Sequence, residues 1–82
     1  MLKKGNIVKL NSRGLRHHDK KYYRKSIHKT NYMIVIGPIK IKNNKTKWLL
    51  RDAFSDICDN YYDIHLELVA DTTQFLYNKY LN

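Results

Sequence analysis

This chain of 82 residues carries a net charge of +9, and 43% of its residues are hydrophobic. That length and composition fit one small folded domain, residues 1–82, and exclude a disordered chain. Its single cysteine, Cys58, excludes an internal disulfide and a zinc site built from several cysteines. No apolar stretch approaches the roughly 20 residues that a membrane-spanning helix needs, so we expect a cytoplasmic protein.

The first part of the chain predicts a strand followed by a long charged segment. Residues 3–11 predict the strand, because a turn-forming glycine precedes isoleucine, valine and leucine. Residues 12–30 hold few apolar residues and form a long basic insertion. We expect this insertion to be an ordered or partly ordered loop with at most a few helical turns. The alternatives are a short helix over residues 20–28, capped by Asp19, and a long mobile loop.

A hairpin of two strands is the clearest prediction for the middle of the chain. Residues 31–42 predict a strand, since the sequence MIVI is continuously apolar and the sequence IKIK then alternates. Gly37-Pro38 interrupts it and predicts a kink, a bulge or a strand end, because proline cannot donate a ladder hydrogen bond. Residues 43–46 have the composition of a turn, and residues 47–52 predict the returning strand.

The last third of the chain admits two interpretations. One is a helix, because apolar residues recur at spacings of three and four. These residues are Phe54, Ile57, Tyr61, Ile64 and Leu68. The other is a loop or short helix over residues 53–62 followed by a strand over residues 63–69, and we favour this one. A helix over residues 72–80 is expected to follow, with Asp71 and Gln74 as a capping pair.

The charges are divided unevenly between two halves of the chain. Residues 1–48 contain fourteen Lys or Arg and one acidic residue, a net charge of +13, whereas residues 49–82 contain two basic and six acidic residues, a net charge of −4. Such an asymmetry indicates a polyanionic partner, which is a nucleic acid, a membrane surface or an acidic protein. A membrane is the weakest of the three, because the basic segment lacks an apolar face. The acidic half could also meet the basic half of a second copy, which would favour a homodimer.

The segment RHHDKKYYRKSIHK, residues 16–29, concentrates the positive charge around two tyrosines. Its lysines and arginines suit phosphates and its aromatic rings suit unpaired bases, which together indicate single-stranded or looped RNA. Lys40 and Lys42 are expected on one face of their strand, as an extension of this surface. The predicted nucleic-acid-binding residues are Arg13, Arg16, His17, His18, Lys20, Lys21, Tyr22, Tyr23, Arg24, Lys25, His28, Lys29, Lys40, Lys42 and Lys47. The simpler alternative is a solvated loop that serves solubility, but six basic residues against one acid argue against it.

No spacing in the sequence predicts an enzyme, a cofactor or a metal site. His17, His18 and His28 are residue types that bind metals and transfer protons. They show neither the converging ligand set that zinc needs nor a paired acid and base. Cys58 lies among acidic residues rather than the basic ones that activate a thiol, so we expect a half-buried packing residue. His65 alternates with apolar neighbours and is expected to point outward from a strand.

The order of the expected strands resembles a known small fold. The sequences KGNIVKL, YMIVIGPI, KWLLRD and DIHLELV follow one another as in a five-stranded antiparallel barrel of the Src-homology-3 type, a group to which KOW domains belong. The resemblance covers residues 4–69. It implies a mainly β fold with short helices (α+β), in which the barrel carries a long basic insertion after strand 1 and a C-terminal helix.

Length, charge and composition also resemble the small basic accessory proteins of T-even phages, among which is an RNA-binding inhibitor of a bacterial RNA-cleaving toxin. This resemblance implies a phage protein that acts in the host cytoplasm on an antiviral toxin or another RNA-dependent host factor. Together with the basic segment, it predicts a non-enzymatic RNA-binding protein with weak sequence specificity. Two alternatives stay open, which are a protein-binding inhibitor that covers an acidic host protein and a DNA-binding regulator.

Overall fold

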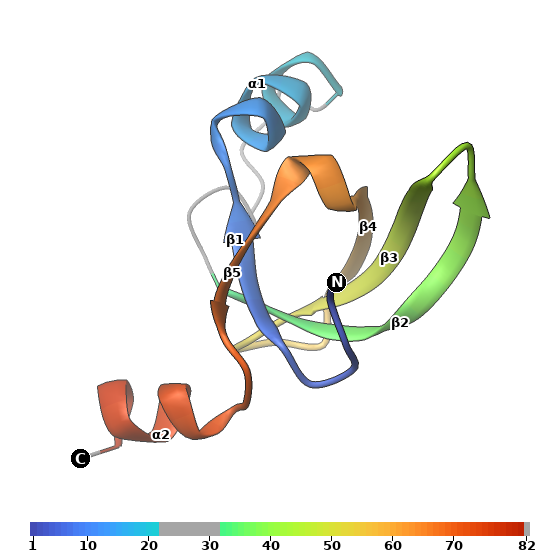
Figure 1. Cartoon of the computed structure of the whole chain (residues 1–82). Helices are drawn as coiled ribbons and strands as arrows, with labels where there is room; N and C mark the ends of the chain where they lie inside the picture. The colour runs from blue at the N-terminus through green and yellow to red at the C-terminus, as the bar shows by residue number, and fades with distance from the viewer. Residues whose placement is uncertain (22–31, 82) are drawn as a thin grey trace.

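The computed structural model describes residues 1–21 and 32–81, and of residues 19–21 it describes the backbone alone. Within these ranges, five strands form one antiparallel sheet in the order β4-β3-β2-β1-β5 (Figure 1). The strands are β1 (Ile7–Leu10), β2 (Met33–Lys42), β3 (Lys45–Asp52), β4 (Cys58–Tyr62) and β5 (Leu66–Ala70). The helices are α1 (Ser12–Lys21) after β1, the 3-10 helix η2 (Asp63–His65) between β4 and β5, and α2 (Gln74–Tyr80) after β5. A mainly β fold with a C-terminal helix is therefore confirmed.

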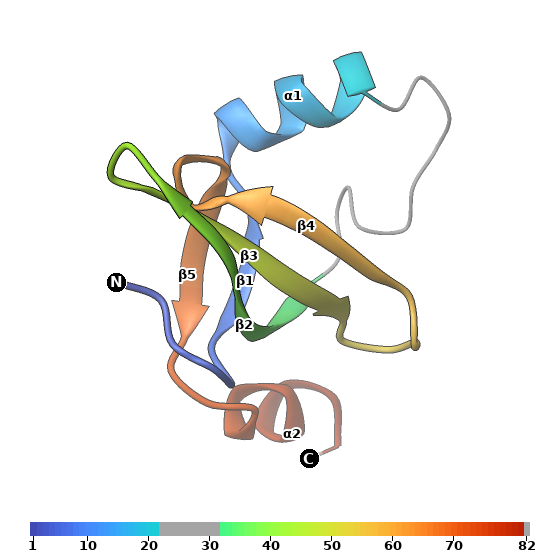
Figure 2. The same ribbon diagram turned by 90° about the vertical axis from the view of Figure 1, so that its right-hand side faces the viewer.

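The sheet is strongly bent. β4 and β5 are its two edges, yet they are consecutive in the chain and only the three residues of η2 separate them. The sheet therefore has to curve until its two edges approach each other at η2, and both ribbon views show this curvature (Figure 1, Figure 2). No helix within the described ranges has the length and apolar character that crossing a membrane requires.

One face of the bent sheet carries the hydrophobic core. β3 shows the pattern most clearly, because every second residue from Thr46 to Asp52 is buried and the residues between them are half-buried. All five strands contribute to the core. Its buried hydrophobic residues are Ile7, Val8, Leu10, Met33, Val35, Trp48, Leu50, Tyr61 and Leu66.

The structure corrects the sequence prediction around β4. Residues 58–62, expected to be a loop or a short helix, form a strand, and residues 63–65 form η2 before β5 begins. β4 has the sequence CDNYY, which lacks apolar alternation, and within it only Tyr61 is buried. Hydrogen bonding to β3, rather than a local pattern, makes these residues a strand. Cys58 at its start is exposed, not half-buried as expected.

Helix α2 packs against the end of the sheet through aromatic rings. Tyr32 meets Phe75 edge to face with ring centres 5.3 Å apart, and the Lys79 Nζ donates a hydrogen bond to the Tyr32 hydroxyl oxygen at 2.9 Å. The predicted capping pair is not formed, because the backbone N–H of Gln74 donates to the Thr72 Oγ1 at 3.3 Å instead. The helix itself lies where the sequence predicts it.

Candidate nucleic-acid interface

The hairpin of β2 and β3 extends beyond the rest of the sheet as an arm (Figure 1, Figure 2). Its turn consists of Asn43 and Asn44, whose φ angles of 51° and 64° lie in the left-handed region. Two consecutive residues of this kind make the turn that suits the twist of a hairpin, and asparagine tolerates this region better than most side chains. Register shifts on either side of Gly37-Pro38 show that the expected interruption is an irregularity inside β2 and not the end of the strand.

Four lysines share one face of this arm. Lys40 lies opposite Lys47, and Lys42 lies opposite Lys45. Side chains two residues apart on a strand point to the same side, as do those of directly opposed residues, so the four lysines form one surface, which we call the lysine face. Lys40, Lys42 and Lys45 are exposed, whereas Lys47 is half-buried. Among the described residues, no carboxylate forms an ion pair with any of the four.

β4 adds an aromatic ring beside the lysine face. Tyr62 is the cross-strand partner of Lys47, and the Lys47 Nζ lies 5.5 Å from the centre of the Tyr62 ring. An ammonium group at this distance is attracted by the electrons of the ring. The sequence offered no reason to place Tyr62 on a basic surface, because its sequence neighbours are acidic. The register between β3 and β4 brings it there.

Helix α1 replaces the first part of the expected loop. It begins at Ser12, where the Asn11 Oδ1 accepts the backbone N–H of Gly14 at 2.8 Å and caps the helix. Asp19, the predicted cap of a later helix, lies inside α1. The described part of the basic insertion is therefore a regular helix that starts well before residue 20.

α1 is held tightly against η2. The Asn11 backbone N–H donates to the His65 carbonyl oxygen at 3.1 Å, and the Asn11 Nδ2 donates to the Ile64 carbonyl oxygen at 2.9 Å. Gly14 faces the same His65 carbonyl, and a Cβ at Gly14 would overlap its oxygen and lie 3.1 Å from its carbon. Only glycine permits this approach, so the position of the helix on η2 is closely defined.

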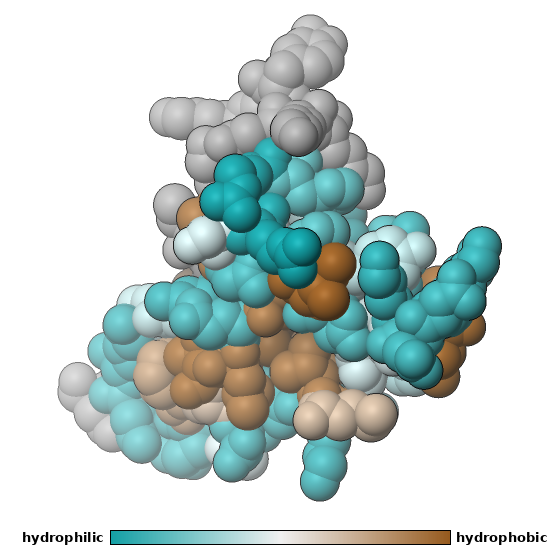
Figure 3. All heavy atoms as spheres, turned by 45° about the horizontal axis from the view of Figure 1, so that its top comes forward, coloured by the Kyte–Doolittle hydropathy of each residue, from teal (hydrophilic) through white to brown (hydrophobic). Residues whose placement is uncertain are grey.

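The exposed arginines of α1 and the tip of the arm lie at the same end of the molecule. Arg13 and Arg16 are both exposed, three residues apart on the helix. Both ribbon views place α1 and the turn of the arm beyond the same end of the sheet (Figure 1, Figure 2). Seen from this end, hydrophilic side chains cover α1 and much of the arm (Figure 3). We call Arg13, Arg16 and the lysine face together the basic end.

η2 connects the two parts of the basic end. The backbone N–H of Thr46 in β3 donates to the Asp63 Oδ2 at 3.4 Å, which ties the arm to η2. On the other side, the His17 ring of α1 stacks on the His65 ring, with ring centres 4.5 Å apart and planes 12° apart. His65 is thus a half-buried residue of η2, not the outward-facing strand residue that the sequence suggested.

Charged groups of both α1 and the arm affect the pKa of His65. Burial is the largest cause that lowers the pKa of His65 below its usual value of 6.5. The neighbouring His17, Arg13 and Lys45 lower the pKa of His65 further, and Asp63 acts in the opposite direction. Positive charges on α1 and on the arm therefore both lower the pKa of the His65 imidazole.

His18 does not belong to the basic end, although the sequence placed it among the binding residues. Its side chain is 1% exposed, and its Nδ1 lies 2.8 Å from the Tyr61 hydroxyl oxygen inside the molecule. On a helix, residue 18 lies one turn after Gly14 and Leu15, which face the sheet. A loop has no such periodicity. The sequence prediction of a loop therefore gave no reason to expect that His18 points into the molecule. His18 is a core residue.

Most of the other predicted contacts fall outside the described part of the structure. Lys20 and Lys21 belong to α1 by their backbone, and their side chains are not described. Outside the described ranges lie Tyr22, Tyr23, Arg24, Lys25, His28 and Lys29. The contact of all these residues with RNA stays a prediction. Of the described ones, Arg13, Arg16, Lys40, Lys42 and Lys47 occur together at the basic end.

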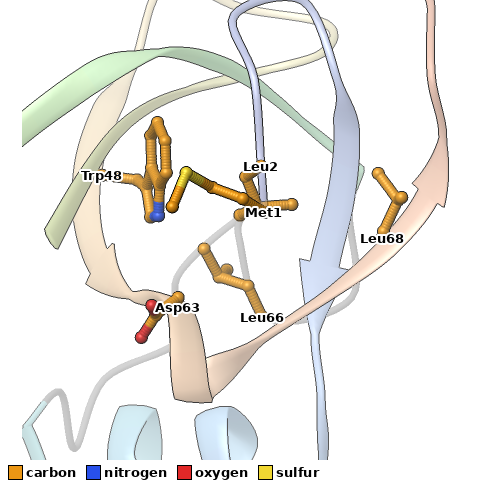
Figure 4. A pocket seen from close by; sticks show the side chains of 6 residues that line it. All are labelled: Met1, Leu2, Trp48, Asp63, Leu66 and Leu68. Atoms are coloured by element: carbon orange, nitrogen blue, oxygen red, sulfur yellow. The ribbon is translucent and has the colours of Figure 1, made fainter. Parts of the chain in front are cut away.

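Away from the basic end, the molecule has a pocket with a mainly apolar lining. A pocket of about 370 Å³ lies between the residues before β1 and the strands around Trp48 and Leu66 (Figure 4). Its lining residues are Met1, Leu2, Trp48, Asp63, Leu66 and Leu68. Asp63 is the single charged side chain of this lining, so the lining offers no basic side chain to a phosphate. Among the described residues, no three His, Cys, Asp or Glu side chains gather as metal ligands would.

No family model, curated protein or solved structure matches this chain. The chemistry of the basic end is therefore the basis on which a function can be inferred.

Proposed function

We propose that this protein is a non-enzymatic RNA-binding module whose contacts are the lysine face and the exposed arginines of α1. The observation that carries the proposal is the register of the arm, which sets Lys40 against Lys47 and Lys42 against Lys45. Like charges directly opposite each other on a sheet are destabilising, so this arrangement costs the free protein stability. A row of phosphates would relieve the repulsion and release counterions from the nucleic acid.

Two features favour single-stranded or looped RNA over a duplex. Tyr62 lies beside Lys47, where an unpaired base could stack on its ring for about 1–3 kcal/mol. Arg13 and Arg16 can bind a phosphate through two N–H groups or stack on a base. Such groups contact phosphates and the faces of bases rather than base edges, so we expect weak sequence specificity.

The strand order supports a finer description of the fold as part of this proposal. β1 pairs with both β2 and β5, and η2 alone joins the two edge strands. We infer that the bent sheet closes into a small barrel of the Src-homology-3 type. The basic helix α1 then stands in the connection after the first strand, and the arm extends beyond the barrel.

Two variants with equal charge loss test the RNA proposal. The arm variant carries K40Q, K42Q and K45Q, and the control variant carries K3Q, K4Q and K9Q. All six lysines are exposed, but those of the control precede or lie in β1 and are not part of the arm. Fluorescence anisotropy measures the binding of a labelled single-stranded RNA of about 20 nucleotides at several salt concentrations.

We expect the arm variant to bind RNA roughly tenfold more weakly or worse at physiological salt. A plot of the logarithm of the association constant against the logarithm of the salt concentration has a negative slope. The magnitude of this slope should decrease by about 2, because each of the three lost phosphate contacts removes about 0.7 from it. The control variant should stay within about threefold of the wild type, since its lysines do not line the lysine face. Equal losses in both variants would contradict a localised site.

The behaviour of the wild type decides between the proposal and its alternatives. Absence of RNA binding at low salt would overturn the proposal and favour an inhibitor that covers an acidic protein. Duplex DNA that displaces RNA at equal salt concentration would favour a DNA-binding regulator. Tight RNA binding with a steep salt dependence that the arm variant loses would support the proposal.

The resemblance to small basic phage proteins extends the proposal to a partner. We expect the protein to join a host RNA-dependent factor, such as an antiviral toxin, in a complex bridged by RNA. Tagged protein isolated from the bacterial host should carry the factor with it, and RNase treatment should release that factor. A complex that survives RNase would reveal direct protein contact and contradict the bridged arrangement. Size-exclusion chromatography of the same material would show whether a homodimer takes part.

A further inference from the structure

His17 and His65, which we call the histidine pair, lie where α1 meets η2. Their rings are stacked with centres 4.5 Å apart, and both side chains are half-buried. The His65 Nδ1 is buried and has no hydrogen-bond partner among the described residues. The His65 backbone is fixed by the hydrogen bond from Asn11 and by the close approach of Gly14. The pair is therefore positioned by packed elements.

Two cations, one carboxylate and one aromatic ring lie around the histidine pair. Arg13 of α1 and Lys45 of the arm both act on His65, and Asp63 of η2 opposes them. Tyr61 of β4 meets the His17 ring edge-on, with ring centres 6.4 Å apart. Two neighbouring cations and a second imidazole disfavour protonation of a histidine ring, because a further positive charge would be repelled. In the free protein, His65 consequently resists protonation.

We propose that the histidine pair, together with Arg13 and Lys45, is a phosphate-binding site that takes up a proton when a backbone phosphate of RNA occupies it. This inference rests on the proposed RNA binding and deepens it by naming one contact. A phosphate beside the two cations reverses the local charge, so that a protonated imidazole becomes the favoured form and donates a charge-assisted hydrogen bond. The proton comes from solvent and returns to it when the RNA leaves, and no covalent bond is made or broken.

The direction of the pH dependence follows from proton linkage. Burial and the neighbouring cations hold the pKa of His65 low in the free protein, and a bound phosphate raises it. The complex therefore holds more protons than the free protein, and the affinity for RNA increases as the pH falls. The change should fall between about pH 7.5 and about pH 5.5, on either side of the ordinary histidine pKa of about 6.5.

The test measures the affinity of the full chain for an oligouridylate of about 20 nucleotides at constant ionic strength. Neither uracil nor a phosphodiester titrates in this pH window, and the fluorescent label is one whose emission does not change there. We expect the affinity to increase about threefold to tenfold from pH 7.5 to pH 5.5, since a tenfold change corresponds to a pKa raised by one unit. Calorimetry in two buffers of different ionisation enthalpy should show proton uptake on binding.

Histidine variants assign the proton to its site. The double variant H17Q and H65Q replaces both rings with neutral amides, and its affinity should no longer depend on pH. The control variant K3Q, K4Q and K9Q changes no histidine and lies outside the basic end, and it should keep the increase. Circular dichroism checks the fold of each variant, and the calorimetric proton count on the wild type needs no variant.

The outcomes separate this inference from the proposed function. RNA binding that does not change with pH and takes up no proton overturns the phosphate site and leaves the RNA proposal intact. Absence of RNA binding at every pH and salt concentration overturns the RNA proposal itself, and this inference with it. A pH dependence that survives in the double variant, or disappears in the variant K3Q, K4Q and K9Q, places the proton elsewhere and also overturns the site.

Discussion

Replacing Gly14 with alanine is expected to destabilise the protein by about 1–3 kcal/mol, the usual cost of forcing extra atoms into a packed contact. The added Cβ would overlap the carbonyl oxygen of His65 and lie 3.1 Å from the Leu10 Cδ2. The obstacle is backbone, which cannot rotate away as a flexible side chain can. A domain of this size has roughly 0.05–0.15 kcal/mol of stability per residue, so the loss is a large share of the total.

Urea denaturation followed by the fluorescence of Trp48 measures this loss, and G37A is the matched control. Gly37 lies in β2, and nothing stands within 4 Å of a Cβ built there. Its φ lies outside the left-handed region that disfavours other residues. We expect G37A to change the free energy of unfolding by less than about 1 kcal/mol. A similar loss in both variants would mean that α1 does not pack on η2 through Gly14.

Replacing Leu50 with alanine should cost about 2–5 kcal/mol, the largest single effect that we expect. Leu50 is 0% exposed and lies in β3, between β2 and β4, so its removal opens a cavity that the surrounding strands cannot close. The expected result is a large decrease in the denaturation midpoint with a similar dependence on urea concentration.

L68A is the control for this prediction, because it deletes the same atoms from a leucine that is 49% exposed. L68A should lower the free energy of unfolding by less than about half as much as L50A. Removing a partly solvated side chain opens a smaller cavity and takes less apolar surface out of the protein interior. Equal costs would contradict the placement of the core beneath β3. If L50A does not fold at all, the conservative pair L50V and L68V replaces it, and L50V should be the less stable of the two because Leu50 is buried and Leu68 is 49% exposed.

The hairpin was predictable because its signals are local. The alternation in IKIK, the asparagine turn and the Gly37-Pro38 bulge all act within a few residues of each other. The shared face of Lys40 and Lys42 follows from the same alternation. β4 was missed because CDNYY carries no comparable pattern and becomes a strand by pairing with β3.

His17 and His18 show where the prediction of a loop for the basic segment was wrong. His18 turned out to be buried and His17 half-buried, because α1 starts at Ser12 and presents one face to the sheet. The helix start depends on Asn11, a good capping residue, but Asn11 is also held by the carbonyl of residue 64. No sequence pattern within residues 12–30 predicts a contact with a segment that lies more than 40 residues further along the chain.

By itself, the sequence determined the uneven charge, the hairpin with its lysines on one face, and the C-terminal helix. These features depend on composition and on patterns that repeat every two to four residues. Such patterns can be recognised within a short stretch of the sequence. Only the tertiary structure decided that Tyr62 joins the lysine face and that His65 stacks on His17. Both contacts follow from strand register and from the pairing of β1 with β5, and those depend on how distant segments share one core.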